Sequence, residues 1–109
     1  MENIEILDCT LRDGGRIIDC VFEDRTIIGI GKQLKNAGID IIELGFLRSH
    51  VKCEENSTFF SSIQDADRYI SQICAGCLSK HEKYVLFVDC DLYDINELVN
   101  ADQSGISGI

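Results

Sequence analysis

The apolar positions of the chain form alternating short runs and longer periodic stretches. Short apolar runs predict four β-strands, at residues 4–8, 40–45, 84–90 and 105–109. Apolar residues that recur every three or four positions predict three helices, at residues 22–36, at residues 62–74 and from Asp94 onward. Strands that alternate with helices in this way are typical of a parallel sheet with right-handed crossovers, so the expected fold class is α/β.

Local signals mark the ends of the predicted helices. Gly38 follows the first helix and is expected to adopt the left-handed conformation of a C-terminal cap. Ser62 with Asp65 three residues later resembles a capping box, and Asp94 with Glu97 repeats that pattern at the third helix. These signals support the helix boundaries independently of the apolar periodicity.

The composition is that of a small globular domain, with 45% hydrophobic residues among 109. The net charge of −9 argues against nucleic acid or an anionic membrane as a partner, because both require a basic surface. No apolar run approaches the length that spans a membrane, and Met1 is followed at once by Glu2 and a strand instead of a signal peptide. A cytoplasmic location is therefore expected.

Six cysteines are distributed along the chain. Without a signal peptide they are expected to be reduced thiols, several of them buried as small apolar side chains. Cys74 and Cys77 have the spacing of a redox or zinc motif, but the chain has no second pair, and the two follow a helix instead of opening one. A metal or redox role therefore remains an alternative at this one place.

The first candidate site lies directly after the first predicted strand, at residues 7–15. Arg12 offers a planar set of donors that suits a carboxylate or an enolate oxygen, and Asp13 offers oxygens that suit a divalent cation. Gly14 and Gly15 allow the backbone to turn sharply beside them. The same pattern also fits a surface turn held by a salt bridge, and the spacing alone does not separate the two interpretations.

Further polar residues follow the second and third predicted strands. Glu43 interrupts a buried strand, where a charge is costly unless it is paired. It either lies at a solvated edge or points into the site and pairs with Arg12. Arg48 and His50, in the next loop, either touch a substrate or are solvated, and Asp89 ends the third strand.

Three stretches resemble the DRE-TIM metallolyases, a family that contains pyruvate aldolases, hydroxymethylglutaryl-CoA lyase and the isopropylmalate and homocitrate synthases. They are residues 8–15 (DCTLRDGG), residues 37–46 and, more weakly, residues 85–91. The branch that they resemble most is 4-hydroxy-2-oxovalerate aldolase. The resemblance implies a TIM (β/α)8 barrel, which needs about 250 residues. Residues 1–109 are therefore expected to be an incomplete domain, the N-terminal part of a barrel with about three and a half βα units.

The resemblance also implies roles for individual residues. Asp13 would be the first ligand of a divalent metal, Mn²⁺ or Mg²⁺, and Arg12 would stabilise an enolate. Glu43 would orient Arg12 or a bound water. The residues expected to bind substrate are Arg16, Arg48 and Asp89. The family takes its other metal ligands from a His-x-His pair, which this sequence lacks, so the 109 residues alone are expected to be inactive.

The expected function is cleavage of 4-hydroxy-2-oxo acids to pyruvate and an aldehyde. Arg16 stands where the nearest aldolases carry a histidine, which leaves the general base unassigned. One alternative is a Claisen-type synthase that condenses acetyl-CoA with a 2-oxo acid, although the synthases usually have a glutamine at the position of Arg16. Another is a non-catalytic module that binds an anionic metabolite. The complete protein is expected to be a homo-oligomer, and an acylating aldehyde dehydrogenase, the partner of some aldolases in this group, is a further expectation.

Overall fold

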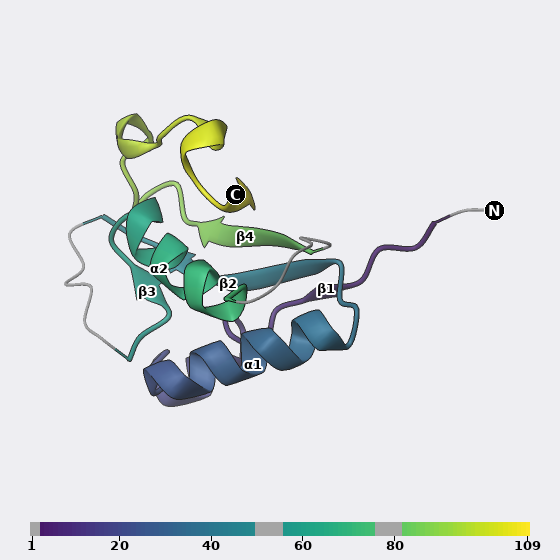
Figure 1. Ribbon diagram of the computed structural model, residues 1–109. Helices are drawn as coiled ribbons and strands as arrows, with labels where there is room; N and C mark the ends of the chain where they lie inside the picture. The colour runs from purple at the N-terminus through teal and green to yellow at the C-terminus, as the bar shows by residue number, and fades with distance from the viewer. Residues whose placement is uncertain (1–2, 50–55, 76–81) are drawn as a thin grey trace.

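The computed structural model describes residues 3–49, 56–75 and 82–109, which fold into a five-stranded sheet covered by helices (Figure 1). All pairs between its strands are parallel. Four strands lie side by side in the order β1-β2-β4-β5, which is also their order along the chain. Their bounds are Leu7–Asp8 for β1, Ile41–Leu47 for β2, Lys83–Val88 for β4 and Ile106–Gly108 for β5. The predicted α/β class is confirmed, with the sequential parallel strands expected for the first part of a barrel.

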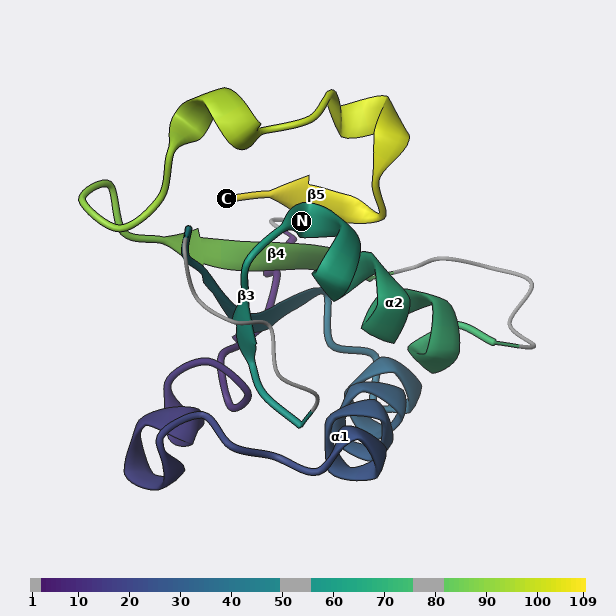
Figure 2. The same ribbon diagram turned by 90° about the vertical axis from the view of Figure 1, so that its left-hand side faces the viewer.

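Two helices cover one face of the sheet and lie side by side (Figure 2). They are α1, at Asp24–Asn36, and α2, at Ile63–Ile73. Side chains alternate between the two faces of a strand, so Ile42 and Leu44 of β2 share one face, where they are fully buried in the core beneath the helices. Tyr69 of α2 packs into the same core. The hydrophobic core therefore lies between the sheet and its helices.

The other face of the sheet carries a mixed lining of apolar and charged side chains. Glu43 of β2 and Val85 and Phe87 of β4 lie on this face, and together with Leu7 and Ile109 they line a shallow depression. In the described structure Leu7 is 50% exposed and Ile109 is 59% exposed. In a closed barrel the corresponding face is the interior, so Glu43 lies where inward-facing residues are expected.

The first strand is shorter than the predicted range of residues 4–8. Only Leu7 and Asp8 pair with β2. Just before them, the carboxylate of Asp40 accepts a hydrogen bond from the amide of Ile6 at 2.8 Å, which occupies a donor that a longer strand would use. Ile4 consequently lies outside the sheet and is exposed.

A short strand that the sequence did not predict, β3 at Phe59–Phe60, pairs with the end of β2. Gly45 permits this pairing, because a Cβ there would lie 2.1 Å from the carbonyl oxygen of Thr58. The amide of Phe46 donates to the same oxygen at 2.9 Å. The strand β2 therefore extends two residues further than predicted, into the range expected to be a loop.

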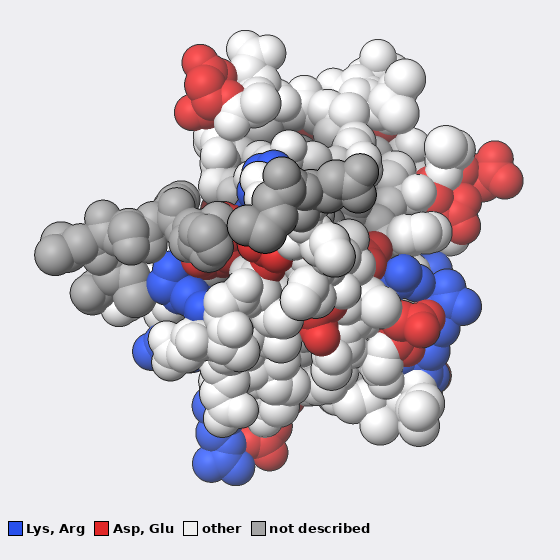
Figure 3. Space-filling model, turned by 90° about the vertical axis from the view of Figure 1, so that its right-hand side faces the viewer, with Lys and Arg blue, Asp and Glu red and all other residues white. Residues whose placement is uncertain are grey.

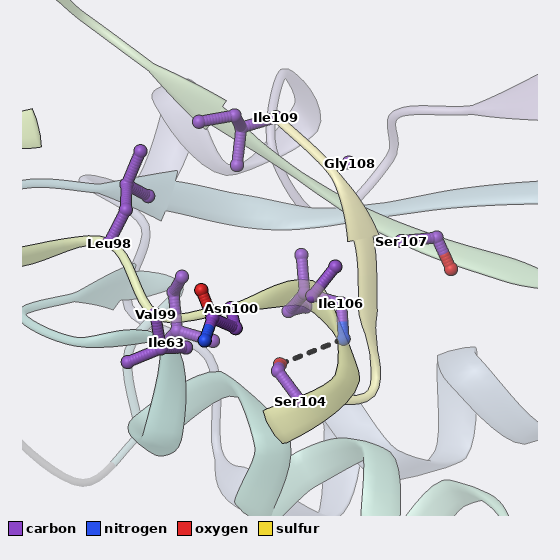
Figure 4. A pocket seen from close by; sticks show the side chains of 10 residues that line it. Ile63, Leu98, Val99, Asn100, Ser104, Ile106, Ser107, Gly108 and Ile109 are labelled. Atoms are coloured by element: carbon purple, nitrogen blue, oxygen red, sulfur yellow. Dashed lines mark hydrogen bonds between the residues drawn. The ribbon is translucent and has the colours of Figure 1, made fainter.

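The predicted third helix does not form. Two short 3-10 turns stand in its place, at Ile95–Glu97 and Ala101–Gln103. Asp94 does cap the first turn, since its carboxylate accepts from the amide of Asn96 at 2.9 Å. Ile95 and Leu98 pack poorly and are 67% and 37% exposed, and a short helix without such packing is unstable in water. An open cavity of about 160 Å³ lies between this segment, the start of α2 and β5 (Figure 4).

The end signals of the other two helices are confirmed. Gly38 has a φ of +80°, the left-handed conformation that glycine adopts without strain. The hydroxyl of Ser62 accepts from the amide of Asp65 at 3.3 Å and donates to its carboxylate at 2.9 Å. Both helices thus begin and end within two residues of their predicted bounds, because these signals are local.

A buried ion pair joins the end of α1 to the start of β4. Nζ of Lys35 lies 2.7 and 3.0 Å from the two carboxylate oxygens of Glu82, and the two side chains are 10% and 1% exposed. The hydroxyl of Tyr84 donates to the same carboxylate at 2.7 Å, and Sγ of Cys74 lies 3.4 Å from that hydroxyl. Cys74 thus belongs to a hydrogen-bonded cluster, while Cys77, its partner in the predicted motif, lies outside the described residues.

The end of the molecule at which the strands begin carries acidic and basic side chains interspersed with each other (Figure 3). No helix within the described ranges is long and apolar enough to cross a membrane. The side chains with candidate chemistry gather at the opposite end, where the strands finish.

Candidate functional site

The loop after β1 places two charged side chains at the end where the strands finish. The amides of Arg12 and Asp13 both donate to the carbonyl of Cys9, at 3.1 and 2.7 Å, which closes a tight turn. Leu11 is fully buried and attaches this turn to the core. In Figure 2 the purple loop after β1 and the yellow-green loop after β4 lie on the side to which the arrow of β4 points. Open α/β sheets bind their ligands at this edge.

Arg12 and Glu43 form a two-point ion pair on the open face of the sheet. Nε and Nη2 of Arg12 donate to the two carboxylate oxygens of Glu43 at 3.0 and 3.2 Å. The side chains are 18% and 9% exposed, and the guanidinium carbon lies 4.9 Å from the centroid of the Phe87 ring. The hydrogen bond to Glu43 raises the pKa of Arg12, although burial acts in the opposite direction. The predicted pairing is confirmed, and it fixes the orientation of a permanent positive charge.

Asp13 lies beside this pair with its carboxylate exposed to solvent. Its Oδ1 is 3.3 Å from Nη1 of Arg12 and 3.6 Å from Nε of Arg16, which follows in a 3-10 helix at Gly14–Ile18. A guanidinium has five N–H groups, and the hydrogen bonds to Glu43 and Asp13 use three of those of Arg12. Within the described residues, two donors of Arg12 are therefore left for an oxygen of a ligand.

Arg48 lies against aromatic rings at the end of β2. Its guanidinium carbon is 5.0 Å from the ring centroid of Phe46 and 4.6 Å from that of Phe59. The ring of Phe46 also meets Phe87 edge-on at 5.5 Å, and the guanidinium of Arg16 lies 5.8 Å from its centroid. We call Phe59, Phe46 and Phe87 the aromatic row. Guanidinium groups stack along the whole row. Arg48 contacts Phe59 and Phe46, Arg16 contacts Phe46, and Arg12 contacts Phe87.

The Nε atom of Arg48 is buried and has no hydrogen-bond partner in the part of the chain that the structure describes. Sequence reasoning named Arg48 but did not foresee the aromatic row. The contact between Arg48 and Phe46 could have been predicted, because residues two positions apart lie on the same face of an extended strand. The contribution of Phe59 could not be read in this way, because it depends on the unpredicted pairing of β3 with β2.

Asp89 stands at the end of β4 and organises its own turn. Its carboxylate accepts from the amide of Asp91 at 3.3 Å, and its carbonyl accepts from the amide of Leu92 at 2.9 Å. No hydrogen bond within the described ranges joins Asp89 to Arg12, so contact with substrate stays a prediction for this residue. His50 lies outside the described residues.

The site around Arg12 offers a divalent metal one carboxylate ligand, that of Asp13. Among the described residues, no group of three or more His, Cys, Asp or Glu side chains gathers closely enough to hold an ion. Asp13 offers an exposed carboxylate whose oxygens suit Mn²⁺ or Mg²⁺, so it fits a single coordination position. The other ligands would have to come from outside these residues.

No family model and no solved structure matches this chain, but curated proteins do. The chain is 39% identical over 79 residues to the 2-isopropylmalate synthase of Buchnera aphidicola subsp. Schizaphis graminum (strain Sg), an alignment that covers 69% of this chain and 14% of the relative. It is 44% identical over 46 residues to the 2-isopropylmalate synthase of Bacillus velezensis (strain DSM 23117 / BGSC 10A6 / LMG 26770 / FZB42), which covers 42% of this chain and 9% of the relative. The chain therefore spans only a small part of the length of these relatives.

These relatives are synthases. The 2-isopropylmalate synthases are members of the DRE-TIM family, so the matches support the resemblance to that family. They do not support the expected closeness to 4-hydroxy-2-oxovalerate aldolase. They favour the alternative that the sequence motifs had placed second, a synthase of the Claisen type.

Proposed function

We propose that this chain provides the first part of the active site of a divalent-metal-dependent enzyme that condenses an acyl-CoA with a 2-oxo acid. The observation that carries the proposal is the two-point pairing of Arg12 with Glu43 beside Asp13, at the carboxyl edge of a parallel sheet. The similarity to 2-isopropylmalate synthases supports the choice of reaction.

In a Claisen condensation, the enolate carbon of the acyl thioester attacks the 2-oxo carbon of the acceptor. The electron pair of the carbonyl bond moves to the oxygen, which becomes negatively charged and is then protonated. Hydrolysis of the thioester releases CoA. A donor that is already aimed at this oxygen stabilises the transition state without having to reorganise.

Arg12 is suited to this task because Glu43 holds its guanidinium in one orientation and two of its N–H groups are left for a ligand within the described residues. Asp13 would provide one ligand of a divalent metal, which, when bound, would act as a Lewis acid toward the 2-oxo acid. Glu43 is a positioning residue in this scheme. The residue that removes the proton from the acyl thioester is not assigned.

Cleavage of 4-hydroxy-2-oxo acids is a second candidate, because residues 8–15 and 37–46 resemble the aldolases of the DRE-TIM family. Arg16 matches neither the glutamine that is usual in the synthases nor the histidine of the nearest aldolases. Breaking the C3–C4 bond of such an acid gives an aldehyde and the enolate of pyruvate, whose charged oxygen is again at C2. Arg12 would stabilise that oxygen in the same way. Under this alternative, an acylating aldehyde dehydrogenase would be the proposed partner that consumes the aldehyde.

One pair of assays on the complete gene product with Mn²⁺ separates the two reactions. A synthase releases CoA from acetyl-CoA only when a 2-oxo acid is present, whereas an aldolase releases pyruvate from a 4-hydroxy-2-oxo acid without acetyl-CoA. We expect the first result. Release of neither CoA nor pyruvate across a panel of these acids would contradict both proposals.

The role of Arg12 is tested with Arg12→Gln and with the control Arg25→Gln. Arg25 is an exposed arginine that pairs with Glu23 on the surface. We expect Arg12→Gln to lower kcat by about 100-fold or more, as loss of a donor to a developing oxyanion does in other enzymes. Arg25→Gln should retain the wild-type kcat. Equal kcat values for the two variants would exclude the proposed role.

A further inference from the structure

The guanidinium of Arg48 is held in a position to bind an anion, but within the described residues no anionic group contacts it. Its Nε is buried without a hydrogen-bond partner there, while Phe46 and Phe59 hold the group at 5.0 and 4.6 Å. A buried donor that makes no hydrogen bond is costly and is rare in folded proteins. A guanidinium stacked on rings also keeps the N–H groups at its edge free, and these match the two oxygens of a carboxylate.

The other arginines of this edge are already paired. Arg12 is held by Glu43, and Arg16 shares the carboxylate of Asp13 at 3.6 Å. Arg48 is different, since the salt bridges of the described part of the chain include none to it. Within the described residues, Arg48 therefore lacks the acidic partner that Arg12 and Arg16 have.

The aromatic row connects Arg48 to Arg12, the residue proposed to act at the reaction centre. The guanidinium of Arg48 rests on Phe46, that of Arg12 rests on Phe87, and these two rings are in contact at 5.5 Å. The two guanidinium groups thus stack on adjoining rings of one row, which is the arrangement that an acceptor with its 2-oxo group at Arg12 and a second acidic group near Arg48 would require. Arg16 also contacts Phe46 and adds positive charge to the path between them.

We propose that Arg48 binds a second carboxylate of the acceptor, remote from its 2-oxo acid end, so that the enzyme prefers 2-oxo dicarboxylic acids to 2-oxo monocarboxylic acids. This inference rests on the proposed function for the position of the reacting end, and it deepens that function by naming the class of acceptor. Arg48 is then a specificity-determining residue, because it contacts the substrate away from the bond that forms.

The test compares two acids of the same shape on the complete protein with Mn²⁺. The probes are 2-oxoglutarate and 5-methyl-2-oxohexanoate, in which an isopropyl group replaces the distal carboxylate. Binding of each is measured by calorimetric titration, and turnover by CoA release. The variants are Arg48→Gln, Arg48→Lys and the surface control Arg25→Gln, each checked by thermal denaturation. Arg48→Lys keeps the charge and the aliphatic stem, so it remains informative if Arg48→Gln fails to fold.

We expect the wild type and Arg25→Gln to bind 2-oxoglutarate at least tenfold more tightly than the isopropyl analogue. Arg48→Gln should weaken binding of 2-oxoglutarate at least tenfold and leave the analogue unchanged, and Arg48→Lys should fall between them. Equal binding of the two acids by the wild type would overturn the inference. The inference would also be overturned if Arg48→Gln lowered the melting temperature but left binding of 2-oxoglutarate unchanged. Arg48 would then pair with an acidic residue of the protein itself.

The binding measurement separates this inference from the proposed reaction. If 2-oxoglutarate binds in an Arg48-dependent way but no CoA is released, the acceptor class stands and the condensation reaction is wrong. If CoA is released with monocarboxylic acids and the Arg48 variants behave as wild type, the reaction stands and the acceptor class is wrong.

Discussion

Replacing Lys35 with methionine removes the cation from a buried ion pair and leaves its anion in place. The carboxylate of Glu82 would lose two hydrogen bonds, of 2.7 and 3.0 Å, and keep the one from Tyr84 at 2.7 Å. Glu82 is 1% exposed, so water cannot easily replace the ammonium. Removing one partner of a buried pair typically costs about 3–5 kcal/mol, a large part of the stability of a small domain.

The pH dependence gives this prediction a second signature. Burial raises the pKa of Glu82, but the hydrogen bonds from Lys35 and Tyr84 outweigh it and hold that pKa at about 2 instead of 4.5. A pKa that is lower in the folded state stabilises the fold above the unfolded pKa, by about 3 kcal/mol here, and this contribution is lost as the pH falls from 4.5 toward 2. Without Lys35 the pKa of Glu82 should rise, and protonation would relieve the unpaired charge. The cost of Lys35→Met should therefore be smaller at pH 3 than at pH 7.

Urea denaturation followed by circular dichroism, at pH 7 and pH 3, measures both effects. Lys83→Met is the matched control, because Lys83 is 59% exposed and pairs with the equally exposed Glu5. It should cost less than about 1 kcal/mol. The double variant Lys35→Met with Glu82→Leu should recover most of the loss, since it buries no charge. A cost of Lys35→Met equal to that of the control, or the same cost at both pH values, would refute the reasoning.

Two further predictions concern the site. Gly45→Ala should lower the free energy of unfolding by several kcal/mol and separate β3 from β2, because the new Cβ would lie 2.1 Å from the Thr58 carbonyl oxygen. Gly29→Ala, on a helix position with open space around it, is the control, and equal melting temperatures for the two variants would contradict the prediction. The 109-residue chain alone should bind Mn²⁺ more weakly than micromolar in a calorimetric titration, because Asp13 supplies a single carboxylate. Micromolar binding that survives Asp13→Asn would show that the ion binds elsewhere.

The parts of the structure that the sequence predicted are those that depend on short-range signals. Gly38, Ser62 and the apolar runs each act within a few residues, and they placed the first two helices and the order of the four strands β1, β2, β4 and β5 correctly. The pairing of Arg12 with Glu43 was also accessible, because adjacent parallel strands bring their carboxyl ends together and an unpaired Glu43 would have been costly.

The parts that the sequence did not predict depend on contacts between distant residues. Asp94 does cap a turn, but Ile95 stays 67% exposed instead of packing against the described part of the chain, so the helix does not continue. The aromatic row beneath Arg48 includes Phe59. Phe59 lies there only because Gly45, which has no Cβ, leaves room for the backbone at Thr58 and so for β3. Both features, the missing helix after Asp94 and the position of Phe59, are determined by tertiary packing and not by local propensity.

The order of the strands has a consequence for how the protein is made. In the series β1-β2-β4-β5, each strand pairs with the one that precedes it in the series: β2 with β1, β4 with β2 and β5 with β4. A nascent polypeptide can therefore extend the sheet at one edge as each βα unit leaves the ribosome, without waiting for distant sequence to be synthesised. Because Glu43 belongs to the second strand of this series, the guanidinium of Arg12 can be paired before most of the remaining sheet exists.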